Sequence, residues 1–135
     1  MDEEQSIRSV LGKMKYYANS RKIDEIMSLY RTDISSFEFG EVRDYEKIKV
    51  NCIKGYSQIK GEFEFDFKIE KTIIRDDIAC VYGIQEISGI NGNGRFEEKI
   101  LATYIFEKIN EKWLIIHHHL STNRVAKNSK STEAI

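Results

Sequence analysis

Apolar residues in the first part of the chain recur with the period of an α-helix. Between residues 3 and 18 they are separated by steps of three and four, as the buried stripe of one helix requires. Residues 19–22 break this pattern, and Ser20 can cap a second, shorter helix. The sequence therefore predicts two helices that pack as a hairpin. Their apolar stripes are Ile7, Val10, Leu11, Met14, Tyr17 and Ala18, followed by Ile23, Ile26, Met27 and Tyr30.

A third helix is expected after a short strand. Residues 34–39 are typical of a strand that ends at Gly40, and Asp44 can then cap a helix that Gly61 terminates. The apolar side of this helix is expected to carry Tyr45, Ile48, Cys52, Ile53 and Tyr56.

Beyond Gly61 the apolar period changes from the helical value to two, which indicates half-buried strands. The first strand alternates without a fault, and we expect further strands over residues 78–88, 96–109 and 113–121. Glycines between residues 89 and 94 supply the positive-φ positions that a hairpin connection needs. The inward residues of the first strand are Phe63, Phe65, Phe67 and Ile69.

The predicted order is helix, helix, strand, helix and then four consecutive antiparallel strands. Such an order predicts an α+β domain in which the helices cover one face of a curved sheet. We expect this single domain to span residues 1–121. The tail at residues 122–135 is polar, has no periodicity and is expected to be disordered at its end.

Both faces of the last two predicted strands are apolar, which is unusual for an antiparallel sheet. Helices can cover only one of these faces, and a second copy of the chain is the most economical cover for the other. The sequence therefore predicts a homodimer that forms through the sheet. The two faces carry Ile100, Ala102, Tyr104 and Phe106 on one side, and Leu101, Thr103 and Ile105 on the other.

Composition argues against several classes of function. The 135 residues include 21 basic and 22 acidic side chains without a segregated basic block, so nucleic acid is not an expected partner. No apolar run approaches membrane-spanning length, and Cys52 and Cys80 are too few for a disulfide framework. We expect a soluble cytoplasmic protein without a membrane partner. The glycines at 89, 92 and 94 join two strands, whereas a phosphate-binding loop opens a helix, so no cofactor is expected.

All three histidines lie in the last predicted strand, between Trp113 and Ser121. Strict alternation places His117 and His119 on one face with Trp113 and Ile115, and His118 on the opposite face with Leu114, Ile116 and Leu120. His117 and His119 are then roughly 7 Å apart, which suits a metal ion. The neighbouring strand offers no obvious third ligand, so packing is favoured over metal binding.

Three segments together resemble a known family. They are residues 23–30 (IDEIMSLY) with Asp33, residues 37–40 (FEFG), and the closing pattern W-x-I-x-H-x-H-x-S of residues 113–121. With four strands between them, they are similar to the nuclear transport factor 2-like superfamily in its SnoaL-like and ketosteroid-isomerase-like branch. The resemblance implies a cone-shaped fold, with three helices on the concave face of a curved sheet, around a mainly apolar pocket.

Members of that superfamily include isomerases, dehydratases, epoxide hydrolases and polyketide cyclases. Others are non-catalytic modules, such as the association domain of calcium/calmodulin-dependent kinase. The fold alone therefore does not decide the function.

The resemblance also implies roles for individual residues. Glu38 occupies the position of the isomerases' proton-transferring carboxylate, and Tyr30 that of a supporting tyrosine. His118 is the second candidate catalytic residue. The isomerases' tyrosine donor and its protonated acid partner correspond to Met14 and Ala102 here, so the pair that stabilises an enolate is missing. The predicted pocket residues are Met14, Tyr17, Tyr30, Ala102, Tyr104, Phe106, Ile116 and Leu120.

Two orientations of Glu38 are open from the sequence. If it faces an apolar cavity, burial raises its pKa and suits it to general acid or base work. Alternation equally allows Glu38 to point outward while Phe37 and Phe39 point inward. The sequence thus predicts a SnoaL-like protein that binds a small apolar organic ligand, either as an isomerase or lyase with a carboxylate base, or as a non-catalytic ligand-sensing or homodimeric association module.

Overall fold

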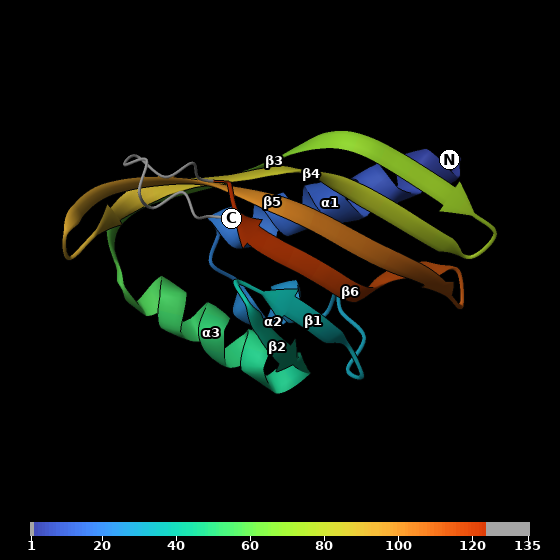
Figure 1. The fold of residues 1–135 in the computed structure, drawn as a ribbon, viewed down its shortest axis with the longest axis horizontal. Coiled ribbons are helices and arrows are strands. Elements are labelled where there is room, and N and C mark those ends of the chain that lie inside the picture. The colour runs from blue at the N-terminus through green and yellow to red at the C-terminus, as the bar shows by residue number, and fades with distance from the viewer. Residues whose placement is uncertain (1, 124–135) are drawn as a thin grey trace, which may run out of the picture.

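Among residues 2–123, six strands form one curved sheet and three helices lie on its concave face (Figure 1). This computed structural model describes residues 2–123. Within that range the elements are α1 (Glu3–Asn19), α2 (Ile23–Met27), β1 (Ser35–Glu38), β2 (Glu41–Asp44), α3 (Tyr45–Ser57), β3 (Ile59–Arg75), β4 (Ile78–Asn91), β5 (Gly94–Ile109) and β6 (Lys112–Thr122). The predicted α+β class and curved sheet are confirmed.

The strand order is β2-β1-β6-β5-β4-β3. Every neighbouring pair is antiparallel except β1 and β6, which run parallel, so the sheet is mixed rather than purely antiparallel. The predicted tail lies outside the described residues from residue 124 onward.

The first two helices begin and end for different reasons. Asp2 caps α1 by accepting from the backbone N–H of Gln5 at 2.8 Å, and the Gln5 side chain accepts from Asp2 N in return. The predicted cap by Ser20 is wrong, because Ser20 ends α1 and α2 begins after Lys22 without a side-chain cap. Arg21, with a φ of +57°, reverses the chain between them.

Helix α3 begins as predicted but ends earlier. The Asp44 side chain accepts from Lys47 N at 2.9 Å, and the helix ends at Ser57 rather than Gly61, which lies inside β3. The prediction that Ile53 is buried is also wrong, since its side chain is 47% exposed. The side of α3 that packs against the core carries Tyr45, Ile48, Cys52 and Tyr56. Ile53 follows Cys52 directly in the sequence and therefore points to a different side of the helix.

The curvature of the sheet arises between β3 and β4. Strand β3 has register irregularities between residues 59 and 63 and between residues 69 and 71. Each lies beside a glycine of β4, because Phe63 pairs with Gly89 and Ile69 pairs with Gly83. A Cβ atom on Gly83 would lie 2.0 Å from the Lys68 carbonyl oxygen, and one on Gly89 would lie 2.5 Å from that of Glu62. Only glycine therefore permits the close approach that bends the sheet.

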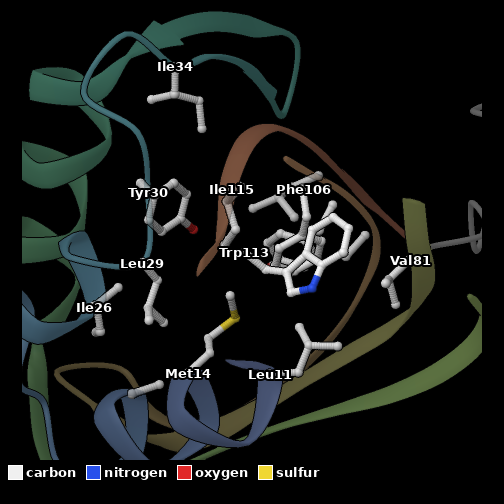
Figure 2. Close-up of a cluster of buried hydrophobic side chains, with 14 of the residues drawn as sticks. Leu11, Met14, Ile26, Leu29, Tyr30, Ile34, Val81, Phe106, Trp113 and Ile115 are labelled. Atoms are coloured by element: carbon white, nitrogen blue, oxygen red, sulfur yellow. The ribbon is translucent and has the colours of Figure 1, made fainter. Parts of the chain in front are cut away.

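The hydrophobic core fills the space between α1 and the inner face of β4–β6 (Figure 2). Phe106 and Ile115 have no exposed surface, and Trp113 is 4% exposed. The segment after α2 is tied to this core through β6, because Ile115 N donates to Leu29 O and Arg31 N donates to Ile115 O, each at 2.9 Å. This end of the fold is therefore occupied by the buried side chains of the core.

Strand β6 contains a bulge that strict alternation does not foresee. Phe106 pairs with Ile115 and Ile105 pairs with His117, so Ile116 is an extra residue. Ile115 and His118 consequently both face inward, and the prediction that they lie on opposite faces is wrong. Before the bulge the inward residues of β6 are apolar, and after the bulge they include His118.

We predict that Gly83→Ala destabilises the fold by about 1–3 kcal/mol, because the added methyl collides with the β3 backbone. Gly55→Ala in α3 is the matched control, since a Cβ there meets nothing within 4 Å. It should stabilise the protein by about 0.5–1 kcal/mol through helix propensity. Urea denaturation measures both, and a Gly83→Ala protein as stable as wild type would contradict this account of the curvature.

Candidate functional site

A cavity of about 480 Å³ opens between the helices and the inner face of the sheet. Its apolar wall comes from all three helices and from β3 to β6, and its polar groups come from β1, β2, α3 and β4 to β6. The apolar lining includes Met14, Ala18, Ile26, Met27, Ile48, Phe63, Phe65, Ile87, Ile100 and Leu120. The polar lining includes Glu38, Arg43, Cys52, Tyr56, Gln85, Tyr104 and His118.

Glu38 points into this cavity. Its residue is 7% exposed, whereas Phe37 and Phe39 on either side are each 46% exposed. The outward alternative for Glu38 is therefore wrong. The parallel pairing of β1 with β6 places Glu38 opposite Leu120, and Phe39 N donates to Leu120 O at 2.9 Å. The backbone thus holds the carboxylate beside the inward side chains of β6.

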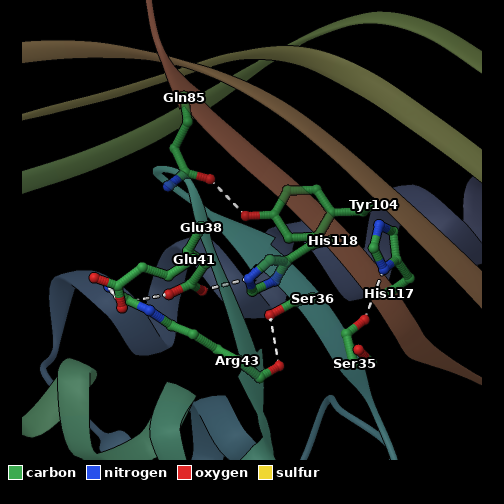
Figure 3. A network of polar contacts seen from close by, with 9 residues as sticks. All are labelled: Ser35, Ser36, Glu38, Glu41, Arg43, Gln85, Tyr104, His117 and His118. Atoms are coloured by element: carbon green, nitrogen blue, oxygen red, sulfur yellow. Dashed lines mark hydrogen bonds and ion pairs between the residues drawn. The ribbon is translucent and has the colours of Figure 1, made fainter.

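His118 and Arg43 both bind the Glu38 carboxylate (Figure 3). The His118 Nε2 atom hydrogen-bonds to Glu38 Oε2, and Arg43 Nη1 donates to Glu38 Oε1 at 2.8 Å. Arg43 Nη2 also donates to Glu41 Oε1 at 3.2 Å at the protein surface. A carboxylate only accepts, so Nε2 carries a proton and donates it to Glu38.

These contacts reverse the predicted shift of the Glu38 pKa. Burial acts to raise the pKa of Glu38, but the hydrogen bond and charge of His118, together with Arg43, outweigh burial and lower it below its ordinary value. The prediction of a raised pKa is wrong because the sequence pattern did not reveal the hairpin of β1 and β2. That hairpin pairs Ser36 with Arg43 and so brings the guanidinium to Glu38.

Two tyrosines enclose the His118 ring. The Tyr30 and Tyr104 rings meet it edge-on, with centroid distances of 5.5 and 5.6 Å. Burial, followed by nearby charge including that of Glu38, raises the pKa of both tyrosines, so both hydroxyls stay protonated near neutral pH. The Tyr104 hydroxyl donates to Gln85 Oε1 at 2.5 Å. The sequence pattern did not single out Gln85 as a site residue, although Gln85 is a polar residue at an inward position of β4.

The structure brings six of the ten predicted site residues to the cavity: Glu38 and His118, with Met14, Tyr30, Tyr104 and Leu120. The other four do not line it. Phe106 and Ala102 are buried in the core, Tyr17 packs against the core from α1, and the β6 bulge puts Ile116 out of phase with His118.

A family model of the SnoaL-like domain matches residues 7–124. The chain belongs to the SnoaL-like family. The resemblance inferred from the sequence is therefore confirmed. No curated protein matches this SnoaL-like chain.

Several solved structures share the SnoaL-like fold at low identity. An NTF-2-like protein of unknown function from Shewanella oneidensis is 20% identical, with 89% of this chain and 99% of that chain covered and a TM-score of 0.76. A candidate dehydratase of the NTF2-like family from Streptomyces avermitilis is 14% identical, with 90% and 96% covered and a TM-score of 0.75. A candidate calcium/calmodulin-dependent protein kinase II association domain from Xanthomonas campestris is 20% identical, with 90% and 89% covered and a TM-score of 0.73.

The other histidines of this SnoaL-like protein lie on the opposite face of the sheet. Their rings flank Phe37, with centroid distances of 5.4 Å to His117 and 5.5 Å to His119. Within residues 2–123, no three His, Cys, Asp or Glu side chains converge as metal ligands.

Cys52 lines the cavity, but burial and the charge of Glu38 raise its pKa to about 11, so it is a neutral thiol. In the described part of the chain, no helix has the length and apolar character needed to cross a membrane.

We predict that Glu38 stabilises the fold less in acid than at neutral pH. Its pKa lies below the ordinary value of 4.5 in the folded protein, so the ionised form stabilises the fold above that value. This contribution is lost as the pH falls through the folded-state pKa. Urea denaturation should show a difference between wild type and Glu38→Gln that shrinks below pH 4.5.

The matched control is Glu41→Gln, which removes the other carboxylate that contacts Arg43 but whose side chain is 70% exposed. Its effect on the unfolding free energy should stay within about 1 kcal/mol throughout, as for exposed ion pairs. A Glu38→Gln difference that grows in acid would contradict the lowered pKa.

Proposed function

We propose that this SnoaL-like protein binds a small, mainly apolar organic molecule in its cavity and moves a proton on it, as isomerases and lyases do. The observation that carries the proposal is the Glu38–His118 pair, which lies buried at a cavity whose remaining wall is mainly apolar. A volume of about 480 Å³ lies in the range of small-molecule sites.

The ionisation of Glu38 supports this chemistry. Its lowered pKa keeps the carboxylate charged near neutral pH, so Glu38 can accept a proton from a ligand and return it. The hydrogen bond from His118 Nε2 holds the carboxylate at the cavity wall. Arg43 keeps Glu38 charged, so the carboxylate orients His118 as well as taking part in the proton transfer. The apolar wall excludes water and strengthens these interactions.

A non-catalytic ligand-sensing or association module is the second candidate. It is favoured by the contact of Arg43 with Glu38, which satisfies the carboxylate without any ligand. Structures named as candidate kinase association domains also share the fold, one from Xanthomonas campestris and one from Exiguobacterium sibiricum. In that case the Glu38–His118 pair ties β1 to β6 and has no catalytic role.

Deuterium exchange separates the two candidates without knowledge of the substrate. We predict that the protein accelerates exchange of the acidic C–H protons of 2-tetralone in D₂O, followed by NMR. Glu38→Gln should reduce this acceleration at least about 100-fold, the usual range of general base catalysis, while ligand binding persists. The Glu41→Gln protein should accelerate the exchange of 2-tetralone protons as much as wild type does. Binding of the ketone without acceleration, or equal rates in Glu38→Gln and wild type, would favour the non-catalytic module.

We further propose that the outer face of the sheet joins two copies of the chain. Apolar side chains remain exposed on this face, with Tyr82 38% and Leu101 43% accessible on β4 and β5. A patch of this kind on an antiparallel sheet is typical of an interface. The strands pair Ile84 with Leu101 and Tyr82 with Thr103, so these side chains form one continuous surface.

We predict that Leu101→Arg yields a monomer, because a charge at the centre of an apolar interface has no partner. Sedimentation velocity at micromolar concentration measures the change. Val50→Arg is the matched control, since Val50 is 56% exposed on α3, away from the sheet. A wild-type monomer, or a dimer that survives Leu101→Arg, would contradict the interface.

A further inference from the structure

We infer that the Gln85 carboxamide, held in place by Tyr104, is the hydrogen-bond donor that selects the ligand of the cavity. The ligand class that fits is an uncharged organic molecule with a carbonyl or similar acceptor oxygen. This inference rests on the proposed function, because it concerns the same cavity. It assigns a specificity role to a residue that lies outside the Glu38–His118 pair.

The two ends of the Gln85 amide have different surroundings. Gln85 is 8% exposed and lines the cavity, and its Oε1 accepts from the Tyr104 hydroxyl at 2.5 Å. The Nε2 atom has no hydrogen-bond partner among residues 2–123, yet it is not sealed from the cavity as His118 Nδ1 is. Figure 3 shows the amide nitrogen turned away from the Tyr104 hydroxyl. Two N–H groups are thus available to a ligand.

Tyr104 fixes which end of the amide is the donor. Because burial raises the pKa of Tyr104, its hydroxyl stays protonated and donates to Gln85 Oε1. If the amide turned over, its N–H could donate to the Tyr104 hydroxyl oxygen, but the hydroxyl proton would then lose its only acceptor among residues 2–123. Tyr104 is therefore a positioning residue, and the N–H groups of Gln85 stay directed into the cavity.

A small pair of residues makes this contact possible. Gln85 pairs with Ile100, and Tyr104 pairs with Val81, so the two polar side chains start well apart along the strands. The pair between them is Gly83 with Ala102. Neither has a side chain larger than a methyl group, so the Tyr104 ring can extend across them to reach Gln85.

The charges of the cavity exclude an anionic ligand. Arg43 is the only cation among its described lining residues, and both of its terminal nitrogens already bind carboxylates. Glu38 and Glu98 add negative charge to the lining. A carboxylate or phosphate would find no free cation there. A pure hydrocarbon would cover the Gln85 N–H groups without a partner, which is costly for a buried donor. A neutral acceptor oxygen avoids both costs.

A matched pair of probes tests the inference. 1-Tetralone and tetralin differ mainly by one carbonyl oxygen, and 1-naphthoic acid has a similar ring system with a carboxylate. We expect wild type to bind 1-tetralone about 10-fold more tightly than tetralin, the magnitude of one hydrogen bond to a buried donor. Binding of 1-naphthoic acid at neutral pH should be weaker than that of 1-tetralone. NMR titration measures all three affinities.

Gln85→Leu should remove the preference for the ketone and leave tetralin binding close to wild type. Gln58→Leu is the matched control, because Gln58 also lines the cavity but is exposed at the end of α3. It should keep the preference. Tyr104→Phe provides a second variant, with a reduced preference, because the amide is then free to turn over. In wild type, the Gln85 side-chain ¹⁵N signal should shift with 1-tetralone and not with tetralin.

The outcomes separate this inference from the proposed function. Equal binding of 1-tetralone and tetralin by wild type, or a preference that survives in a folded Gln85→Leu protein, overturns the role of Gln85 but leaves an apolar cavity that binds ligands. Tighter binding of 1-naphthoic acid overturns the neutral ligand class. If wild type binds none of the three probes, the inference and the proposed ligand-binding function both fail.

Discussion

The close approach of the β3 backbone to β4 is the constraint on which the cavity depends. At Gly83 and Gly89 no Cβ atom fits against β3, and the register of β3 shifts beside both positions. The sheet therefore bends twice along one strand pair, and a bent sheet cannot lie flat against helices. Packing of α1 fills the end near Phe106 and Trp113. The space left under α3 is the cavity.

A second constraint is the cost of burying Glu38. An ionised carboxylate with so little exposure is unstable unless it is paired and hydrogen-bonded. Arg43 on β2 and His118 on β6 supply those partners, so two strands that are far apart in sequence are joined by the same group that gives the cavity its chemistry. Stability of the β1–β2 edge and reactivity of the site are thus coupled. A change that weakens the carboxylate as a base also changes how firmly this edge is held.

Sequence patterns predicted the features that depend on local periodicity. The stripe of α1, the Asp44 cap and the alternation of β3 each require only residues close in sequence, and all three are present. Features that depend on pairing between distant strands were missed. The bulge at Ile116 is defined by the register against β5, and Arg43 reaches Glu38 only through the β1–β2 hairpin. The sign of the Glu38 pKa shift followed from Arg43 and His118, so it could not be derived from alternation.

One of the residues that depart from the isomerase pattern, Ala102, has a structural consequence of its own. Met14 and Ala102 cannot supply the donors of that branch, yet the small side chain of Ala102, opposite Gly83, leaves room for Tyr104 to reach Gln85. Gly83 also permits the bend between β3 and β4. The absence of a side chain at this position therefore shapes the sheet and sets where the cavity can carry a polar group. A larger residue at position 102 would separate Tyr104 from Gln85, and because the Tyr104 ring also packs edge-on against His118, it would disturb both polar groups of the cavity.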